Sequence, residues 1–62
     1  MSGQKQVAAL ARVQAIADQL RDVEARLAET SSTEVQLSLL ERATEAAEEA
    51  ARLLEQVARE LE

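Results

Sequence analysis

Apolar residues recur along the first half of the chain at alternating intervals of three and four. The larger ones are Val13, Ile16, Leu20, Val23 and Leu27. This spacing lines them up as one stripe on an α-helix, and it is the heptad seam of a coiled coil. We therefore expect a helix over about residues 3–29 that packs against at least one other helix.

A second apolar stripe follows, but it does not continue the phase of the first. Continuing the first seam in phase would place Glu34, Glu41 and Glu48 inside. The stripe consists instead of Leu40, Ala43, Ala47, Ala50, Leu54, Val57 and Leu61. Because the register slips by one residue, we expect a separate second helix over about residues 33–61.

The slip coincides with Thr30-Ser31-Ser32-Thr33, a run of consecutive poor helix formers. Ser31 stands three residues before Glu34, which is the spacing of a capping box. We expect a turn at about residues 30–33. A single uninterrupted helix is the alternative, because neither glycine nor proline forces a break there.

A turn at this place makes an antiparallel hairpin in which large residues face small ones. Leu20 would lie opposite Ala43, and Ile16 opposite Ala47, as close packing requires. We predict an all-α fold, one helical hairpin over residues 1–62. Its intrachain core would consist of Val13, Ile16, Leu20, Val23, Leu27, Leu40, Ala43, Ala47, Ala50, Leu54 and Val57.

Apolar residues remain on both flanks of the second stripe, and one partner helix cannot cover both. Soluble monomers rarely leave a continuous apolar strip in water. We therefore expect a homo-oligomer, a dimeric four-helix bundle being favoured over a trimer or tetramer. Its interface would consist of Leu10, Leu37, Leu39, Ala46, Ala50, Ala51 and Leu53.

The run from Ala43 to Ala51 carries alanine on one side of the helix and mostly glutamate on the other. Small side chains let two helices approach to the lower end of the usual range of about 8–10 Å. An isologous dimer sets one patch against its own copy, so we expect the second helix to cross its symmetry mate near Ala46 and Ala50. Thr44, within this run, should bond its own backbone four residues back.

Glutamates mark the solvent side of the second helix. They recur every seven residues as Glu34, Glu41, Glu48, Glu55 and Glu62. On the first helix, Asp22 and Arg26 have the i,i+4 spacing of a weak ion pair.

Composition excludes most kinds of chemistry. The 62 residues include one glycine and no histidine, cysteine, proline or aromatic residue. Disulfides, ordinary zinc sites, histidine-assisted nucleophiles and glycine-rich phosphate loops are therefore absent. The glutamates point outward, unlike the inward carboxylates of di-metal bundles. We expect no enzymatic activity and no cofactor, metal or small-molecule ligand.

The net charge of −5 falls on the second helix, because the first 32 residues carry four positive and four negative side chains. This argues against nucleic acid and against a membrane surface as partners. The apolar runs fall far short of the roughly 20 residues that span a bilayer, and the chain does not open like a secretory signal. We expect a soluble protein, cytoplasmic if natural and otherwise without a native compartment.

In length, turn position and seam, the whole chain resembles the repressor-of-primer hairpin, whose family forms antiparallel four-helix-bundle dimers. That family reads RNA from the exposed face of its first helix. This chain has Leu10, Gln14, Asp18 and Ala25 there. The resemblance therefore implies an architecture and not an activity.

The strict glutamate repeat, the phrase Glu48-Glu49-Ala50-Ala51-Arg52-Leu53-Leu54-Glu55 and the start Met1-Ser2-Gly3 are similar to de novo designed helical-hairpin oligomers. That resemblance implies a structural self-association module without a natural ligand. The alternative is a natural helical adaptor whose apolar flank binds a partner helix.

Overall fold

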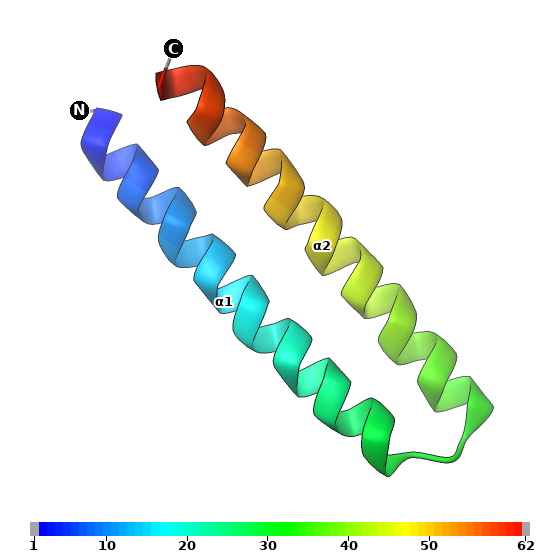
Figure 1. Cartoon of the computed structure of the whole chain (residues 1–62). Coiled ribbons are helices and arrows are strands. Elements are labelled where there is room, and N and C mark those ends of the chain that lie inside the picture. The colour runs from blue at the N-terminus through cyan, green and yellow to red at the C-terminus, as the bar shows by residue number, and fades with distance from the viewer. Residues whose placement is uncertain (1, 62) are drawn as a thin grey trace.

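The computed structural model describes residues 2–61, with side chains from residue 3 onward, and the chain folds as an antiparallel hairpin of two helices (Figure 1). Helix α1 spans Ser2–Glu29 and helix α2 spans Thr33–Leu61. The helices lie side by side along their length, so the start of α1 and the end of α2 share one end of the molecule. The predicted all-α hairpin is confirmed, and the alternative of one uninterrupted helix is wrong.

Hydrogen bonds from the turn residues fix the start of α2. Ser32 is the N-cap, because its Oγ accepts a hydrogen bond from the backbone N–H of Val35 at 3.3 Å. Ser32 N donates to Thr30 Oγ1 at 3.2 Å, and Gln36 Nε2 donates to the Thr30 carbonyl oxygen at 3.2 Å. No non-glycine residue in the described chain has a positive φ, so the turn needs no glycine.

The capping box expected of Ser31 and Glu34 is wrong by one residue. With Ser32 at the N-cap, the third helical position is Val35, whose side chain cannot return the reciprocal bond of a capping box. Ser31 and Ser32 carry the same hydroxyl group, so either could cap the helix. The three-residue spacing to Glu34 pointed to Ser31, whereas Ser32 is the N-cap.

Helix α1 faces α2 with its predicted seam. Ile16 and Val23 are buried, at 1% and 3% exposure. Val13, Leu20 and Leu27 are partly buried beside them.

Helix α2 is rotated about its axis by about 50°, half of a one-residue step, relative to the predicted seam. Its buried residues are Leu39 and Ala46, and the partly buried residues at heptad spacing are Ala43, Ala50, Leu53 and Val57. Exposed instead are three residues that the sequence pattern assigned to the intrachain core, Leu40, Ala47 and Leu54.

The reason is that α2 carries two apolar rows one residue apart, about 100° around the helix, and α1 covers only one of them. The rotation that buries Leu39 and Ala46 also brings Glu49 beside Arg12 of α1. A rotation of α2 that buried Leu40 and Ala47 instead would turn Glu49 away from α1.

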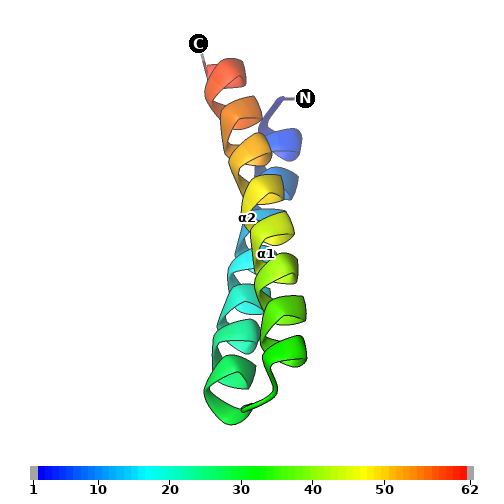
Figure 2. The ribbon, with the colours of Figure 1, turned by 90° about the vertical axis from the view of Figure 1, so that its right-hand side faces the viewer.

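The hairpin is one helix thick. Its extents are 47 × 14 × 11 Å and its radius of gyration is 14.4 Å, compared with about 11 Å for a compact domain of this length. Figure 2 shows the two helices crossing at a small angle within one layer. Domains are normally built from two packed layers, so both flat faces of this hairpin lack the layer that would cover them.

Candidate self-association surface

An ion pair joins the two helices on one flat face. Arg12 Nε donates to Glu49 Oε2 at 2.8 Å, and Arg12 Nη2 donates to Glu49 Oε1 at 2.9 Å. The hydrogen bonds from Arg12 hold the pKa of the Glu49 carboxyl below its usual value. Arg12 directly precedes the seam residue Val13, and Glu49 directly precedes Ala50. We call this side the polar face; it carries Lys5, Arg12, Gln19, Arg26, Arg42, Glu49 and Gln56, with one exposed apolar residue, Val35, near the turn.

Two grooves on the polar face flank the ion pair. One of about 420 Å³ lies near the turn, with Arg26 and Arg42 in its wall. The other, of about 350 Å³, lies near the chain ends, with Lys5 and Gln56 in its wall. No polar side chain is buried among residues 3–61, so neither groove holds a fixed polar group that would orient a small ligand. The described residues also form no cluster of three or more potential metal ligands.

The opposite flat face is apolar, and we call it the open face. On α2 it carries a second row of residues, most of which directly follow a residue that faces α1. The spacing of the row alternates between three and four, and every member is exposed: Leu37, Leu40, Thr44, Ala47, Ala51, Leu54, Ala58 and Leu61. From α1 the open face includes Leu10, which is 52% exposed, and the partly buried Ala17.

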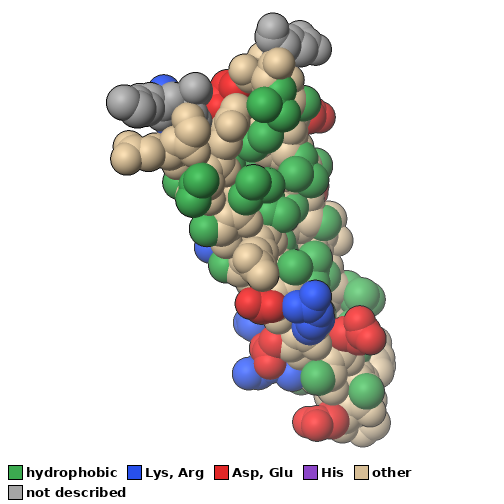
Figure 3. Space-filling view, turned by 60° about the vertical axis from the view of Figure 1, so that its left-hand side comes forward, with side chains coloured by type: hydrophobic (Ala, Val, Ile, Leu, Met, Phe, Trp, Pro, Cys, Tyr) green, Lys and Arg blue, Asp and Glu red, His purple; other side chains and the backbone are tan. Residues whose placement is uncertain are grey.

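The leucines of this row are large apolar residues that are about half exposed or more. Leu40 and Leu54 are 50% and 49% exposed, and Leu37 and Leu61 are 56% and 70% exposed. In the space-filling view, apolar side chains gather over both helices in the half of the molecule that carries the chain ends (Figure 3). The apolar row therefore runs along α2 without a partner in this hairpin, and the apolar surface extends over both helices in the half that carries the chain ends.

The polar member of the row does not interrupt its apolar character. Thr44 Oγ1 donates to the backbone carbonyl oxygen of Leu40 at 2.9 Å, as predicted. Because the hydroxyl hydrogen is already bonded within α2, Thr44 can meet a partner through its methyl group.

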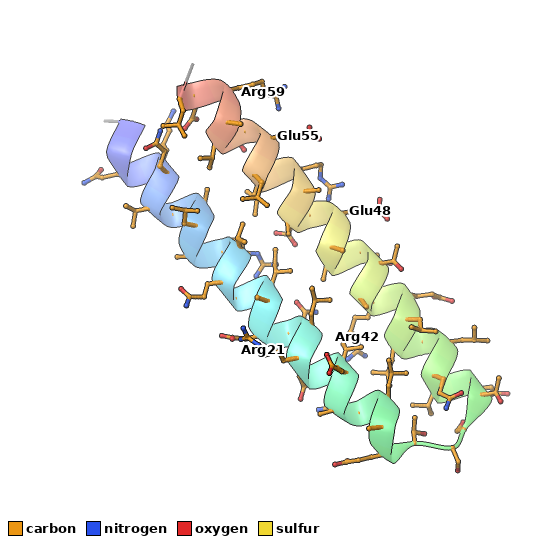
Figure 4. The ribbon with its side chains drawn as sticks, viewed as in Figure 1. Arg21, Arg42, Glu48, Glu55 and Arg59 are labelled. Atoms are coloured by element: carbon orange, nitrogen blue, oxygen red, sulfur yellow. The ribbon has the colours of Figure 1, made fainter. Side chains whose placement is uncertain are left out.

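Charged side chains occupy the edges of the hairpin. Toward the turn, Arg21 pairs with Asp18 at 2.8 Å, and Arg26 pairs with Asp22 at 2.9 Å, the latter as predicted. Figure 4 shows Glu48, Glu55 and Arg59 projecting from the outer side of α2, away from α1. Glu62, the last residue of the predicted glutamate repeat, lies outside the described residues.

The residues expected at an oligomer interface divide between two environments. Leu10, Leu37 and Ala51 lie on the open face. Buried or partly buried against α1 are Leu39, Ala46, Ala50 and Leu53. Ala46 is only 6% exposed, so within the hairpin it offers little surface for the predicted crossing of two α2 helices near Ala46 and Ala50, which stays a prediction.

Sequence reasoning thus missed Leu40, Ala47 and Leu54 as surface residues. The row from Leu37 to Leu61 has the same heptad spacing as the residues of α2 that face α1, and it contains more leucines. This spacing is the sequence signal that identifies a second apolar row.

The chain matches no known protein family, and no curated protein or solved structure is similar to it. Neither described helix is long and apolar enough to cross a membrane. Only the chemistry of the hairpin's own surface bears on what it does.

Proposed function

We propose that this hairpin is a structural self-association module, which assembles with copies of itself and has no natural ligand or catalytic activity. The observation that carries the proposal is the row of exposed leucines on the open face. A contiguous apolar strip of this kind is rare on a soluble monomer and typical of an interface.

The surface area of the hairpin supports the same proposal. Its accessible surface is 4833 Å². A compact monomer of 6.8 kDa exposes about 4,000 Å². The excess of about 800 Å² matches the roughly 800 Å² that each partner contributes to a standard protein interface. One contact of ordinary size would therefore give this chain the exposed surface of a compact protein.

A dimer is the favoured assembly. Each hairpin has one apolar flat face and one polar flat face, so two hairpins stacked through their open faces leave both polar faces in water. The product is a two-layer, four-helix bundle. A trimer or tetramer would need a second apolar surface on each chain.

We further propose that the chain is designed and not natural. The regular glutamate repeat, the absence of aromatic residues and the lack of any similar known protein all support this.

The proposal is tested by the mass of the protein in solution. Sedimentation equilibrium from about 1 μM to 1 mM should give a dimer, and the melting temperature should rise with concentration because folding and assembly are coupled. Leu54→Glu places a carboxylate on the open face and should give monomers. The matched control Gln56→Glu adds a carboxylate two residues away on the polar face and should leave the dimer intact. A wild-type monomer throughout this range would rule the proposal out.

A second candidate is a natural adaptor that binds a helix of another protein. The uneven composition of the open face favours it, because α2 supplies the whole leucine row, whereas the apolar residues that α1 adds are Val7, Leu10 and Ala17, all in its first half. A single partner helix lying along α2 would cover most of the row. An adaptor should be monomeric alone, with a melting temperature that does not depend on concentration.

A further inference from the structure

We infer that the open face is covered by a second copy of this chain in antiparallel orientation, with the two-fold axis passing between Ala47 and Ala51 of each α2 helix. This inference rests on the proposed self-association and specifies its partner and its register. It replaces the crossing near Ala46 and Ala50, since those residues already pack against α1.

The row on α2 is complementary to itself when it is reversed. About an axis between Ala47 and Ala51, every member of the row meets another member. The layers are Ala47 with Ala51 of the second copy, Thr44 with Leu54, Leu40 with Ala58, and Leu37 with Leu61. The centre contains only alanine, so the helices come closest at the axis, and the inner leucines meet smaller residues.

Other registers match less well. An antiparallel shift by half a heptad repeat toward the turn sets Leu37 against Leu54 and leaves Ala58 and Leu61 without partners. A parallel arrangement in register sets each leucine against its own copy and each alanine against its own copy. The layers of paired leucines would then be overfilled and the layers of paired alanines would contain voids, which close packing disfavours.

Helix α1 can be placed relative to the same axis. The Arg12–Glu49 ion pair places residue 12 of α1 at the level of residue 49 of α2, which is the level of the axis. The open-face residues of α1, Leu10 and Ala17, lie on either side of this level. Leu10 lies two residues before this level and Ala17 five residues after it, so the same two-fold rotation sets Leu10 nearest Gln14 of the second copy and Ala17 nearest Val7.

The resulting dimer has antiparallel neighbours throughout. Each α2 packs on its own α1 through the seam and on α2 of the second copy through the row. Each α1 lies beside α1 of the second copy through Val7, Leu10, Gln14 and Ala17. The polar faces, with their grooves and ion pairs, stay on the outside.

The register can be tested by disulfide cross-linking, because the chain has no native cysteine. In the double variant Leu40→Cys/Ala58→Cys, each cysteine should face the other type on the second copy, within the roughly 4.4–6.8 Å between Cα atoms that a disulfide allows. Mild oxidation should therefore give a covalent dimer on a non-reducing gel. Within one chain the two positions are about 27 Å apart along α2, so they cannot pair internally.

The single variants Leu40→Cys and Ala58→Cys are the matched controls. In the antiparallel dimer each cysteine is about 27 Å from its own copy along the axis, so neither variant should cross-link. In a parallel dimer both should. The double variant Leu37→Cys/Leu61→Cys probes the outermost layer of the same register and should also cross-link. It provides the test if the first double variant is not helical by circular dichroism.

Three results would overturn the inference. Cross-linking of the single variants would show a parallel contact. An oligomeric but folded double variant that resists cross-linking would leave the proposed self-association standing and remove this register. A wild-type chain that is monomeric at every concentration would remove both.

Discussion

Ser32 holds the first turn of α2, and its neighbour Ser31 does not. Ser32 Oγ accepts the hydrogen bond from Val35 N. We predict that Ser32→Ala lowers the free energy of unfolding by about 0.5–2 kcal/mol, the usual cost of losing an N-cap side chain. Ser31→Ala, one residue earlier, should change it by less than about 0.5 kcal/mol. Urea denaturation of both variants at one protein concentration makes the comparison, and an equal effect would mean that Ser31 shares the capping role.

Glu49 is the residue whose ionisation is coupled to folding. Its pKa is lowered by hydrogen bonds from Arg12, so its contribution to stability is present above the pKa of the unfolded chain. That contribution is lost as the pH falls through the lower pKa of the folded state. Both side chains are substantially exposed, at 51% and 37%, so the contribution is screened and small.

We therefore predict that Glu49→Gln is less stable than the wild type at pH 7, with the difference vanishing near about pH 2. Glu45→Gln removes the same charge from an exposed position one turn away and is the control. It should change the free energy of unfolding at pH 7 by less than about 0.5 kcal/mol. Chemical denaturation of the three proteins at both pH values measures this. A stability difference that persists in acid would attribute the Glu49 effect to packing of its side chain and not to its charge.

Contact between the helices is concentrated in few large side chains, because alanine supplies much of the α2 seam. Ile16 is 1% exposed, so Ile16→Ala should cost about 2–5 kcal/mol. That is a large part of the roughly 3–9 kcal/mol expected for a chain of this length. Val7, at 68% exposure, is the control, and Val7→Ala should cost less than about 0.5 kcal/mol. Denaturation midpoints that fell equally in both variants would contradict the observed orientation of α1.

The two helices also show how far a sequence pattern determines an element. Helix α1 has one row of large apolar residues, so Ile16 and Val23 could be assigned to its buried side without ambiguity. Helix α2 has two rows of equal period, and hydrophobic periodicity cannot say which of Leu39 and Leu40 faces α1. That choice depends on the geometry of the turn and on the Arg12–Glu49 pair across the helices. Both are tertiary features, which one helix read alone does not contain.

At the scale of the whole molecule, a single layer of two helices explains why so much apolar surface remains. Each helix packs against one neighbouring helix, but the apolar surface of α2 is wide enough to contact two helices. The open face therefore follows from the hairpin architecture together with the second row of α2, from Leu37 to Leu61. Replacing one leucine of the row would reduce the apolar area of the open face. The heptad spacing of the row is the feature that allows it to pair with a reversed copy of itself.

Charge opposes this association, and its effect should depend on position. Each chain carries a net charge of −5, so two copies repel one another. Salt shortens the screening distance from about 30 Å at 0.01 M to about 3 Å at 1 M. We predict that raising the NaCl concentration over this range strengthens the dimer, measured as a fall in the dissociation constant by sedimentation equilibrium. A weakening would show that opposite charges hold the copies together.

Glu48 lies next to Ala47 at the edge of the row, so the two-fold axis would place the Glu48 side chains of both copies close together. Glu34 has the same chemistry near the other end of α2, and its copies would lie about 45 Å apart along the bundle. Glu48→Gln should therefore strengthen the dimer at low salt and reduce its salt dependence, more than Glu34→Gln does. The two variants have identical net charge. Any difference between their dissociation constants therefore reflects how far apart the two copies of the substituted residue lie in the dimer. Equal effects would mean that repulsion acts through total charge, and the axis would then have to lie away from Glu48.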